Sequence, residues 1–290
     1  MIAVELRKLV RRPRTWISIG LICALPVAVA IFVSVSHLAP PPGQGTAFLS
    51  AILQDGSLYP AAALALVLPV FLPVAVAVVA GDAVAGEATA GTLRYLLIRP
   101  IGRTRFLVAK LVTIIMFVLI AVVTVAITSY LTGVLLLGPA VPAAVGQPGA
   151  GQQLQTGGVQ AGSAATSLSG PPLTALQLIE RVGGTIAFIT VSMLGVAAIV
   201  LFLSTVTDSA LGSALGGLAV LIGSEVLATL DAAASIRPYV PTRYWLAWID
   251  FFRQPIFWRD IQRGFGIQVV YVAVFLAAAW ANFGTKDITT

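Results

Sequence analysis

Six apolar runs constrain this chain more than any other feature, because each is about as long as the hydrocarbon core of a bilayer is thick. A helix of about 20 apolar residues crosses a membrane. The runs cover residues 16–36, 60–80, 111–137, 182–203, 210–230 and 264–283. Only 10% of the residues are charged, whereas soluble domains contain about 25%. The sequence therefore predicts an all-α polytopic membrane protein in which residues 1–290 form one transmembrane domain.

The distribution of Lys and Arg predicts the orientation of this domain. Basic residues gather before the first run, between the second and third runs, and at Lys286 after the last. Cytoplasmic segments are enriched in Lys and Arg, so both termini are expected in the cytoplasm. Arg181 and five arginines in the 231–263 segment would then lie outside, against the general bias. The net charge of +6 indicates membrane lipid as a partner and no nucleic acid, since the basic residues flank apolar runs.

The segments between the runs predict further elements. Ile2, Leu6, Leu9 and Val10 have helical spacing, which favours an amphipathic N-terminal helix at the membrane interface, with a simple basic flank as the alternative. Segment 138–174 is uncharged and rich in Gly, Ala and Pro, which is typical of a low-complexity outer loop. Segment 231–263 interleaves aromatic residues with arginine. It predicts one or two short helices at the outer membrane surface, broken near Pro255.

Several residues inside the runs are unusual. Pro69 and Pro73 predict a bent second span. Glu225 lies within the fifth run, where a carboxylate is costly unless it is protonated, paired or facing water, so it is a candidate functional residue. The alternative is that it reaches the interface or caps a neighbouring helix. Gly212 and Gly216 have the GxxxG spacing that allows close helix packing, within the chain or across a dimer.

The basic connector at residues 81–110 is the strongest candidate for a contact with another protein. Leu93, Leu96 and Leu97 form one apolar face of an expected helix over residues 88–98, which the Arg99-Pro100 junction should end. A short helix with such a face suits docking into a partner. The sequence contains no phosphate-binding loop, HExxH or GxSxG motif in context, so we expect no enzyme activity and no bound cofactor or metal.

The connector sequence, GEATAGTLRYLLIRPIGRTRFLVAK, resembles the corresponding stretch of the permease subunits of bacterial type-2 ABC exporters. The matching positions are Gly86-Glu87, Gly91-Thr92-Leu93, Leu96-Leu97, Pro100, Arg103 and Lys110. The amphipathic N-terminus, the six runs and the aromatic segment before the last run fit the same layout. The tail departs from it, because only Lys286-Asp287 stands where such permeases often have several arginines and an aspartate.

This resemblance implies a multi-pass permease in a bacterial cell membrane, working as a homodimer or heterodimer. Two copies of a separate ABC ATPase subunit would bind ATP and Mg and drive export. The implied ATPase-coupling residues are Glu87, Gly91, Thr92, Leu93, Arg94, Leu96, Leu97, Arg99, Pro100 and Arg103. One alternative is an ion-driven secondary transporter using Glu225 and Asp208, although the chain has no internal repeat of the kind such transporters show. The other is a membrane scaffold, and no residue pattern selects a transported substrate.

Overall fold

The computed structural model of the chain describes residues 2–36, 56, 59–89, 91, 103–138 and 173–285. The described residues form helices and turns without any strand. The first half contains α1 (Ile2–Arg11), α2 (Pro13–Ser36), α4 (Tyr59–Val67), α5 (Phe71–Gly81), α6 (Ala85–Thr89), α8 (Arg103–Thr132) and the π-helix η2 (Gly133–Leu137). The second half contains α9 (Ala175–Val206), α10 (Ala210–Thr229), three short 3₁₀ helices and α11 (Trp258–Thr285).

The long helices confirm the all-α membrane fold. Within the described ranges, α2, α8, α9, α10 and α11 are each long and apolar enough to cross a membrane, and α4 with α5 makes a sixth span if the pair is counted as one. The helices extend past the predicted runs. Helix α8 begins at Arg103, and α9 begins at Ala175, because Thr174 and Gln177 form a capping box that satisfies the first amides of α9.

The second span is bent, as its prolines predict. Helices α4 and α5 meet at an angle of 56° across the break at residues 68–70. Pro69 lies in the break and Pro73 in the first turn of α5. Neither proline has a backbone N–H to donate, and each ring crowds the preceding turn, so a continuous helix would be strained here. The bend therefore follows from the two prolines.

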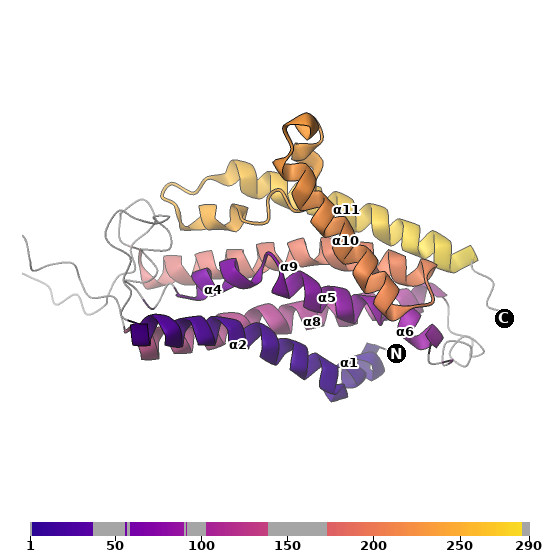
Figure 1. Cartoon of the computed structure of the whole chain (residues 1–290), viewed down its shortest axis with the longest axis horizontal. Coiled ribbons are helices and arrows are strands. Elements are labelled where there is room, and N and C mark those ends of the chain that lie inside the picture. The colour runs from indigo at the N-terminus through magenta and orange to yellow at the C-terminus, as the bar shows by residue number, and fades with distance from the viewer. Residues whose placement is uncertain are drawn as a thin grey trace, which may run out of the picture.

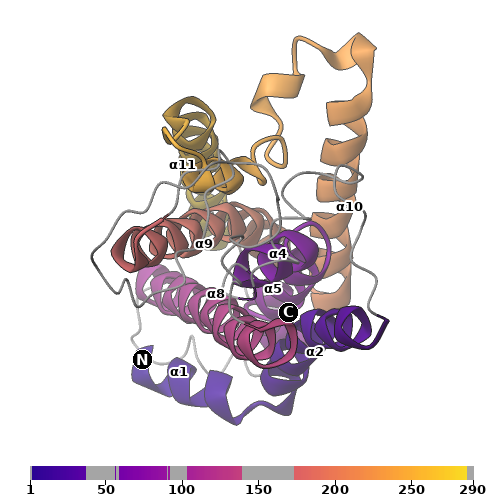
Figure 2. The same ribbon diagram turned by 90° about the vertical axis from the view of Figure 1, so that its left-hand side faces the viewer.

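Helix α9 forms the centre of the bundle. Most long helices run along one axis in Figure 1, and the end-on view shows α9 between α8 and α11, with α4 and α5 beside it. Helices α1 and α2 lie on one side of this group, and α10 is set apart on another (Figure 2). The interior of the bundle includes Phe117 of α8 and Phe188, Ile189 and Met193 of α9, all with at most 1% exposure.

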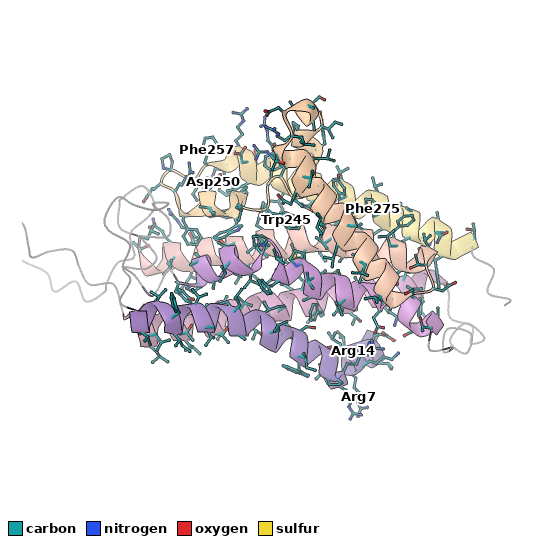
Figure 3. The ribbon with its side chains drawn as sticks, viewed as in Figure 1. Arg7, Arg14, Trp245, Asp250, Phe257 and Phe275 are labelled. Atoms are coloured by element: carbon teal, nitrogen blue, oxygen red, sulfur yellow. The ribbon has the colours of Figure 1, made fainter. Side chains whose placement is uncertain are left out.

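The aromatic segment before α11 forms short helices, and it packs more closely against the bundle than its sequence indicates. It forms η3 (Asp231–Ala233), η4 (Arg237–Tyr239) and η5 (Ala247–Phe252), and the chain breaks around Pro255 as expected. However, η5 packs between α9 and α11. Its surroundings bury four aromatic side chains that were expected at the membrane surface: Trp245, Trp248, Phe251 and Phe252. Small residues make this possible, since the Phe251 ring fits against the Cα of Gly184. Phe257 stays half exposed at the outer edge (Figure 3).

Candidate functional site

The end of the bundle that carries the connector is built around α1. This helix is amphipathic, as predicted, and its apolar residue Leu9 is buried while Val10 is half exposed. It packs along the first turns of α8. The packed face is not purely apolar, because Glu5 is also buried. Helix α1 therefore lies against the bundle through a face that carries both an apolar and an acidic residue.

Four charged side chains from three helices meet where α1 packs against the bundle. We call them the ion network: Glu5 and Lys8 of α1, Glu87 of α6 and Lys110 of α8. Lys110 Nζ donates to Glu5 Oε2 at 2.8 Å and also to Glu87 Oε1. Lys8 Nζ donates to Glu87 Oε1 at 2.9 Å and lies 3.7 Å from Glu5 Oε1. Two acids and two lysines therefore form a closed set that links segments 79 and 105 residues apart.

Three residues of the ion network are buried and Lys8 is partly exposed, and this burial decides how much the network contributes to stability. Glu87 is 2% exposed and Lys110 is 4% exposed. Buried charges lose their hydration, so a buried pair adds little net stability compared with an apolar pair, but removing one partner costs about 3–5 kcal/mol. Lys110 also lies over the Phe106 ring, 5.2 Å from its centroid, which favours the charged amine. The network therefore specifies which helices meet at this end.

The environment of Glu87 favours its ionised form. Burial alone would raise the pKa of this carboxyl group. The charges and hydrogen bonds of Lys110 and Lys8 outweigh that effect and hold the pKa of Glu87 below its ordinary value of 4.5. Because the pKa is lower in the folded protein, the ionic contacts stabilise the fold at neutral pH. This contribution is lost as the pH falls through the folded pKa.

A second ion pair lies beside the network. Arg12, at the corner between α1 and α2, donates from Nη1 to Asp82 Oδ2 at 2.5 Å. Asp82 follows α5 directly, so this pair ties the N-terminal corner to the start of the connector. A Cβ on Gly86 would lie 2.0 Å from Asp82 Oδ1. Gly86, the glycine of the Gly86-Glu87 motif, therefore leaves room for this carboxylate.

The opposite side of α6 is held by the end of α9 and by the turn that follows it. Ser204 Oγ accepts hydrogen bonds from the amides of Val84 and Ala85 at 3.2 and 2.9 Å, and it lies 2.8 Å from the Gly81 carbonyl oxygen, to which it donates. Thr89 Oγ1 lies 2.8 Å from the carbonyl oxygen of Asp208. These contacts satisfy backbone groups that the ends of α5 and α6 leave open. The corner between α5 and α6 is thus held on both sides.

Only part of the predicted coupling surface falls within the described residues. Glu87 is one of them, and it points into the bundle, where it pairs with lysines of this chain. Gly91 is another, with a φ of 66°. Helix α6 ends at Thr89 and the chain turns at Gly91, so the expected helix does not run unbroken from residue 88. Arg103 begins α8. The other predicted coupling residues lie outside the described ranges: Thr92, Leu93, Arg94, Leu96, Leu97, Arg99 and Pro100.

The polar candidates of the fifth span do not come together. Glu225 lies near the end of α10 on its exposed face, and Asp208 precedes the start of the same helix. At 1.5 Å per residue, a helix of this length separates them by about 25 Å, so they do not form one ion site. No group of three metal-ligating side chains occurs among the residues that could be searched.

Inside the chain, α10 approaches its neighbour most closely at Gly217, one residue after the predicted pair Gly212 and Gly216. A Cβ on Gly217 would lie 2.3 Å from Val200 of α9, whereas Gly212 is exposed and Gly216 is half buried. Ser213, four residues before Gly217, is fully buried. Gly212 and Gly216 stay a prediction for contact with a second subunit.

The sequence reasoning missed the partners of Glu87. Lys8 was counted only as a basic residue that orients the spans, Lys110 was noted only as a basic residue and a motif position, and Glu5 was given no role. Two signals were available. Glu5 is the one acid among the first fifteen residues, and it lies one turn before Lys8 on the same helix face. Ser204 gave no signal, because one serine at the end of an apolar run is ordinary.

Comparison with known families assigns the chain. The model of the family described as "ABC-2 family transporter protein" matches residues 1–161. The chain belongs to the ABC-2 transporter family. As a member, it is a membrane permease component and not itself the catalytic subunit, and membership implies an ABC ATPase partner. The matched residues include the whole ion network and the connector. A search of curated proteins gave no match.

Proposed function

We propose that this ABC-2 family protein is the permease subunit of an ATP-driven exporter in a bacterial cell membrane. It would act as a homodimer or heterodimer with two copies of a separate ATPase subunit, which bind ATP and Mg. The connector at residues 81–110 would dock into the ATPase from the cytoplasmic side. Family membership and the position of the ion network directly beside the connector support this proposal.

The observation that carries the coupling proposal is the bridging position of Glu87. This carboxylate contacts Lys8 of α1 and Lys110 of α8, and it follows the α5–α6 corner that Ser204 holds from the other side. A force applied to the connector therefore reaches α1 and α8 through ionic contacts and the α9–α10 turn through hydrogen bonds. The bend at residues 68–70 gives the second span a place to flex.

The mechanism that follows is mechanical. Closure of the ATPase subunits around ATP would shift the connector, and α1, α6 and α8 would move with it because their charged side chains are in direct contact. Ionic contacts tolerate small changes of distance and angle better than close-packed apolar contacts do. The ion network can therefore stay connected while the helices tilt. The path for cargo would open on the other side of the membrane.

The test uses the full chain copurified with its ATPase in lipid nanodiscs. We expect Leu93→Asp to abolish copurification, because a charge on the docking face opposes burial. We expect Glu87→Gln to keep copurification but to lower permease-dependent stimulation of ATP hydrolysis about tenfold. Arg7→Gln, on the exposed side of α1, is the matched control and should leave both unchanged. Transport that follows a proton gradient, with no ATPase copurifying, would contradict the proposal.

A further inference from the structure

Two adjoining cavities lie beside the ion network. The first, of about 280 Å³, is open on one side and is lined by α1, α2, α5, α8 and the start of α10. The second, of about 640 Å³, lies between the α1–α2 corner, α6 and the α9–α10 turn. Both are lined by Arg12, Arg14, Asp82, Ala210 and Leu211. They therefore meet at these residues, and we call the joined space the arginine cavity.

The charges around the arginine cavity are not all compensated. Lys8, Arg12, Arg14 and Lys110 line the first part, against Glu5 and Asp82. Asp208 is a further acid in the second part. The two lysines pair within the ion network, and Arg12 pairs with Asp82. Arg14 lines both parts and forms no ion pair with any residue that the structure describes. Its guanidinium group is therefore available to an anion.

The arginine cavity also has an apolar wall. Val78, Val79, Ile114 and Ala214 line the first part beyond the charged residues. The exposed apolar faces of α2 and α10 continue this wall along the membrane-spanning helices, with Ile17 and Leu211 both more than 60% exposed. Figure 2 shows α2 and α10 flanking α5 on the same side of the bundle. The space thus changes from charged to apolar along its length.

We propose that the arginine cavity binds an anionic amphiphile, with a phosphate head at Arg14 and an apolar chain along Val78, Ile114 and Leu211. A planar guanidinium group binds phosphate through two parallel hydrogen bonds, and it loses hydration more readily than an ammonium group. Asp82 keeps Arg12 in place behind the head. A phospholipid of the adjacent leaflet and an amphipathic cargo share this chemistry. The proposal concerns binding and does not require the transport function.

Arg7 provides a matched control for Arg14. Both are basic residues of the same N-terminal region, and removal of either changes the net charge equally. Figure 3 shows Arg7 projecting away from the bundle, whereas Arg14, near the α1–α2 corner, lines the arginine cavity. A general attraction of anions to a basic surface would weaken equally in the two variants. A built site responds only to Arg14.

The experiment measures binding of dodecyl phosphate to the purified full chain in an uncharged detergent, by isothermal titration. We expect Arg14→Ala to weaken binding about tenfold or more, as loss of a charge-assisted contact predicts, and Arg7→Ala to change it less than about twofold. Ala210→Phe, which fills the cavity without changing charge, should weaken binding comparably to Arg14→Ala. Inorganic phosphate and dodecylphosphocholine should bind at least about tenfold more weakly than dodecyl phosphate.

Three outcomes would overturn the proposal: equal losses in Arg14→Ala and Arg7→Ala, unchanged binding in Ala210→Phe, or equal binding of inorganic phosphate. Native mass spectrometry then distinguishes the two sources. A phospholipid adduct that copurifies with the wild-type chain and is lost in Arg14→Ala identifies a resident lipid. Binding of dodecyl phosphate to a chain without such an adduct identifies a site for a free amphiphile. Gel filtration checks that each variant is folded.

Discussion

The connector end of the bundle and the aromatic segment at residues 240–257 are fastened by different physics. At the connector end, α1, α6 and α8 meet through three buried charges, Glu5, Glu87 and Lys110, and the partly exposed Lys8. In the aromatic segment, Trp248 and Phe252 pack edge to face at 6.1 Å between ring centroids. Neutral hydrogen bonds add to this packing, as where Gln268 Nε2 donates to the Pro241 carbonyl oxygen at 2.6 Å. One region is held by charge and the other mainly by shape.

This difference suggests which region moves. Close-packed rings lose their contacts when neighbours shift by less than an ångström, so the aromatic segment resists small displacements. Ionic attraction falls off slowly with distance, so the ion network tolerates them. A permease driven from the connector needs movable contacts near the driver and fixed contacts elsewhere. The comparison makes predictions that separate the two regions.

The largest effect should follow loss of Lys110. Lys110→Met leaves the buried Glu5 and Glu87 with only the partly exposed Lys8 as a partner, and we expect a loss of about 3–5 kcal/mol in unfolding free energy. Chemical unfolding of the full chain in detergent measures it. Arg105→Met, an exposed change on the same helix, is the control and should cost less than about 0.5 kcal/mol. If both variants lose the same unfolding free energy, the cost of removing a charge from α8 does not depend on whether that charge is buried.

A loss of similar or slightly smaller size should follow truncation of the aromatic packing. Trp248 is fully buried, and Trp248→Ala removes a large ring at a cost of about 3–5 kcal/mol. Phe257→Ala is the control, because that ring is 48% exposed.

The two regions should also differ in ATP hydrolysis by the assembled complex, with Lys110→Met uncoupling it and Trp248→Ala leaving it coupled. If both variants uncouple hydrolysis, the division into moving and fixed regions is wrong.

The smallest effect concerns how stability depends on pH. Ionisation of Glu87 at the connector end should stabilise the fold, whereas ionisation of Asp250 in the aromatic segment should destabilise it. Burial raises the pKa of Asp250 in η5 above its ordinary 3.8, against the opposing charge of Arg253 and with the help of Asp260. A raised carboxyl pKa means that the ionised form costs stability at neutral pH, and that cost disappears as the pH falls through the raised pKa. Glu87, with a lowered pKa, loses a stabilising contribution on acidification.

Variants at these two positions test the signs. Glu87→Gln should melt at a lower temperature than the wild type at about pH 7, with the gap narrowing towards about pH 4. Asp250→Asn should melt at a higher temperature at about pH 7, and its gap should also narrow on acidification. Differential scanning fluorimetry across this range measures both. If both variants melt below the wild type at about pH 7, or both melt above it, the two carboxylates do not lie in opposite electrostatic environments.

Local features of the fold were predictable from the sequence, and long-range partners were not. The bend at Pro69 and Pro73 was predicted, because proline acts on the turn around it. The burial of Trp248 against the bundle was not predicted, because an aromatic residue beside arginines has the same local pattern whether or not a neighbouring helix covers it. The pairing of Glu87 with Lys8 depends on how α1 folds back, and no periodicity within one segment encodes that contact.

The hydroxyl group of Ser204 has a consequence for how the chain can be divided. It belongs to the second half of the protein, yet it satisfies amides at Val84 and Ala85 and the carbonyl of Gly81 in the first half. A fragment that ends within residues 139–172 would lack these partners at the α5–α6 corner. Two such fragments, produced together in one cell, should assemble into a working permease. The N-terminal fragment produced alone should be degraded, although it contains every residue of the ion network.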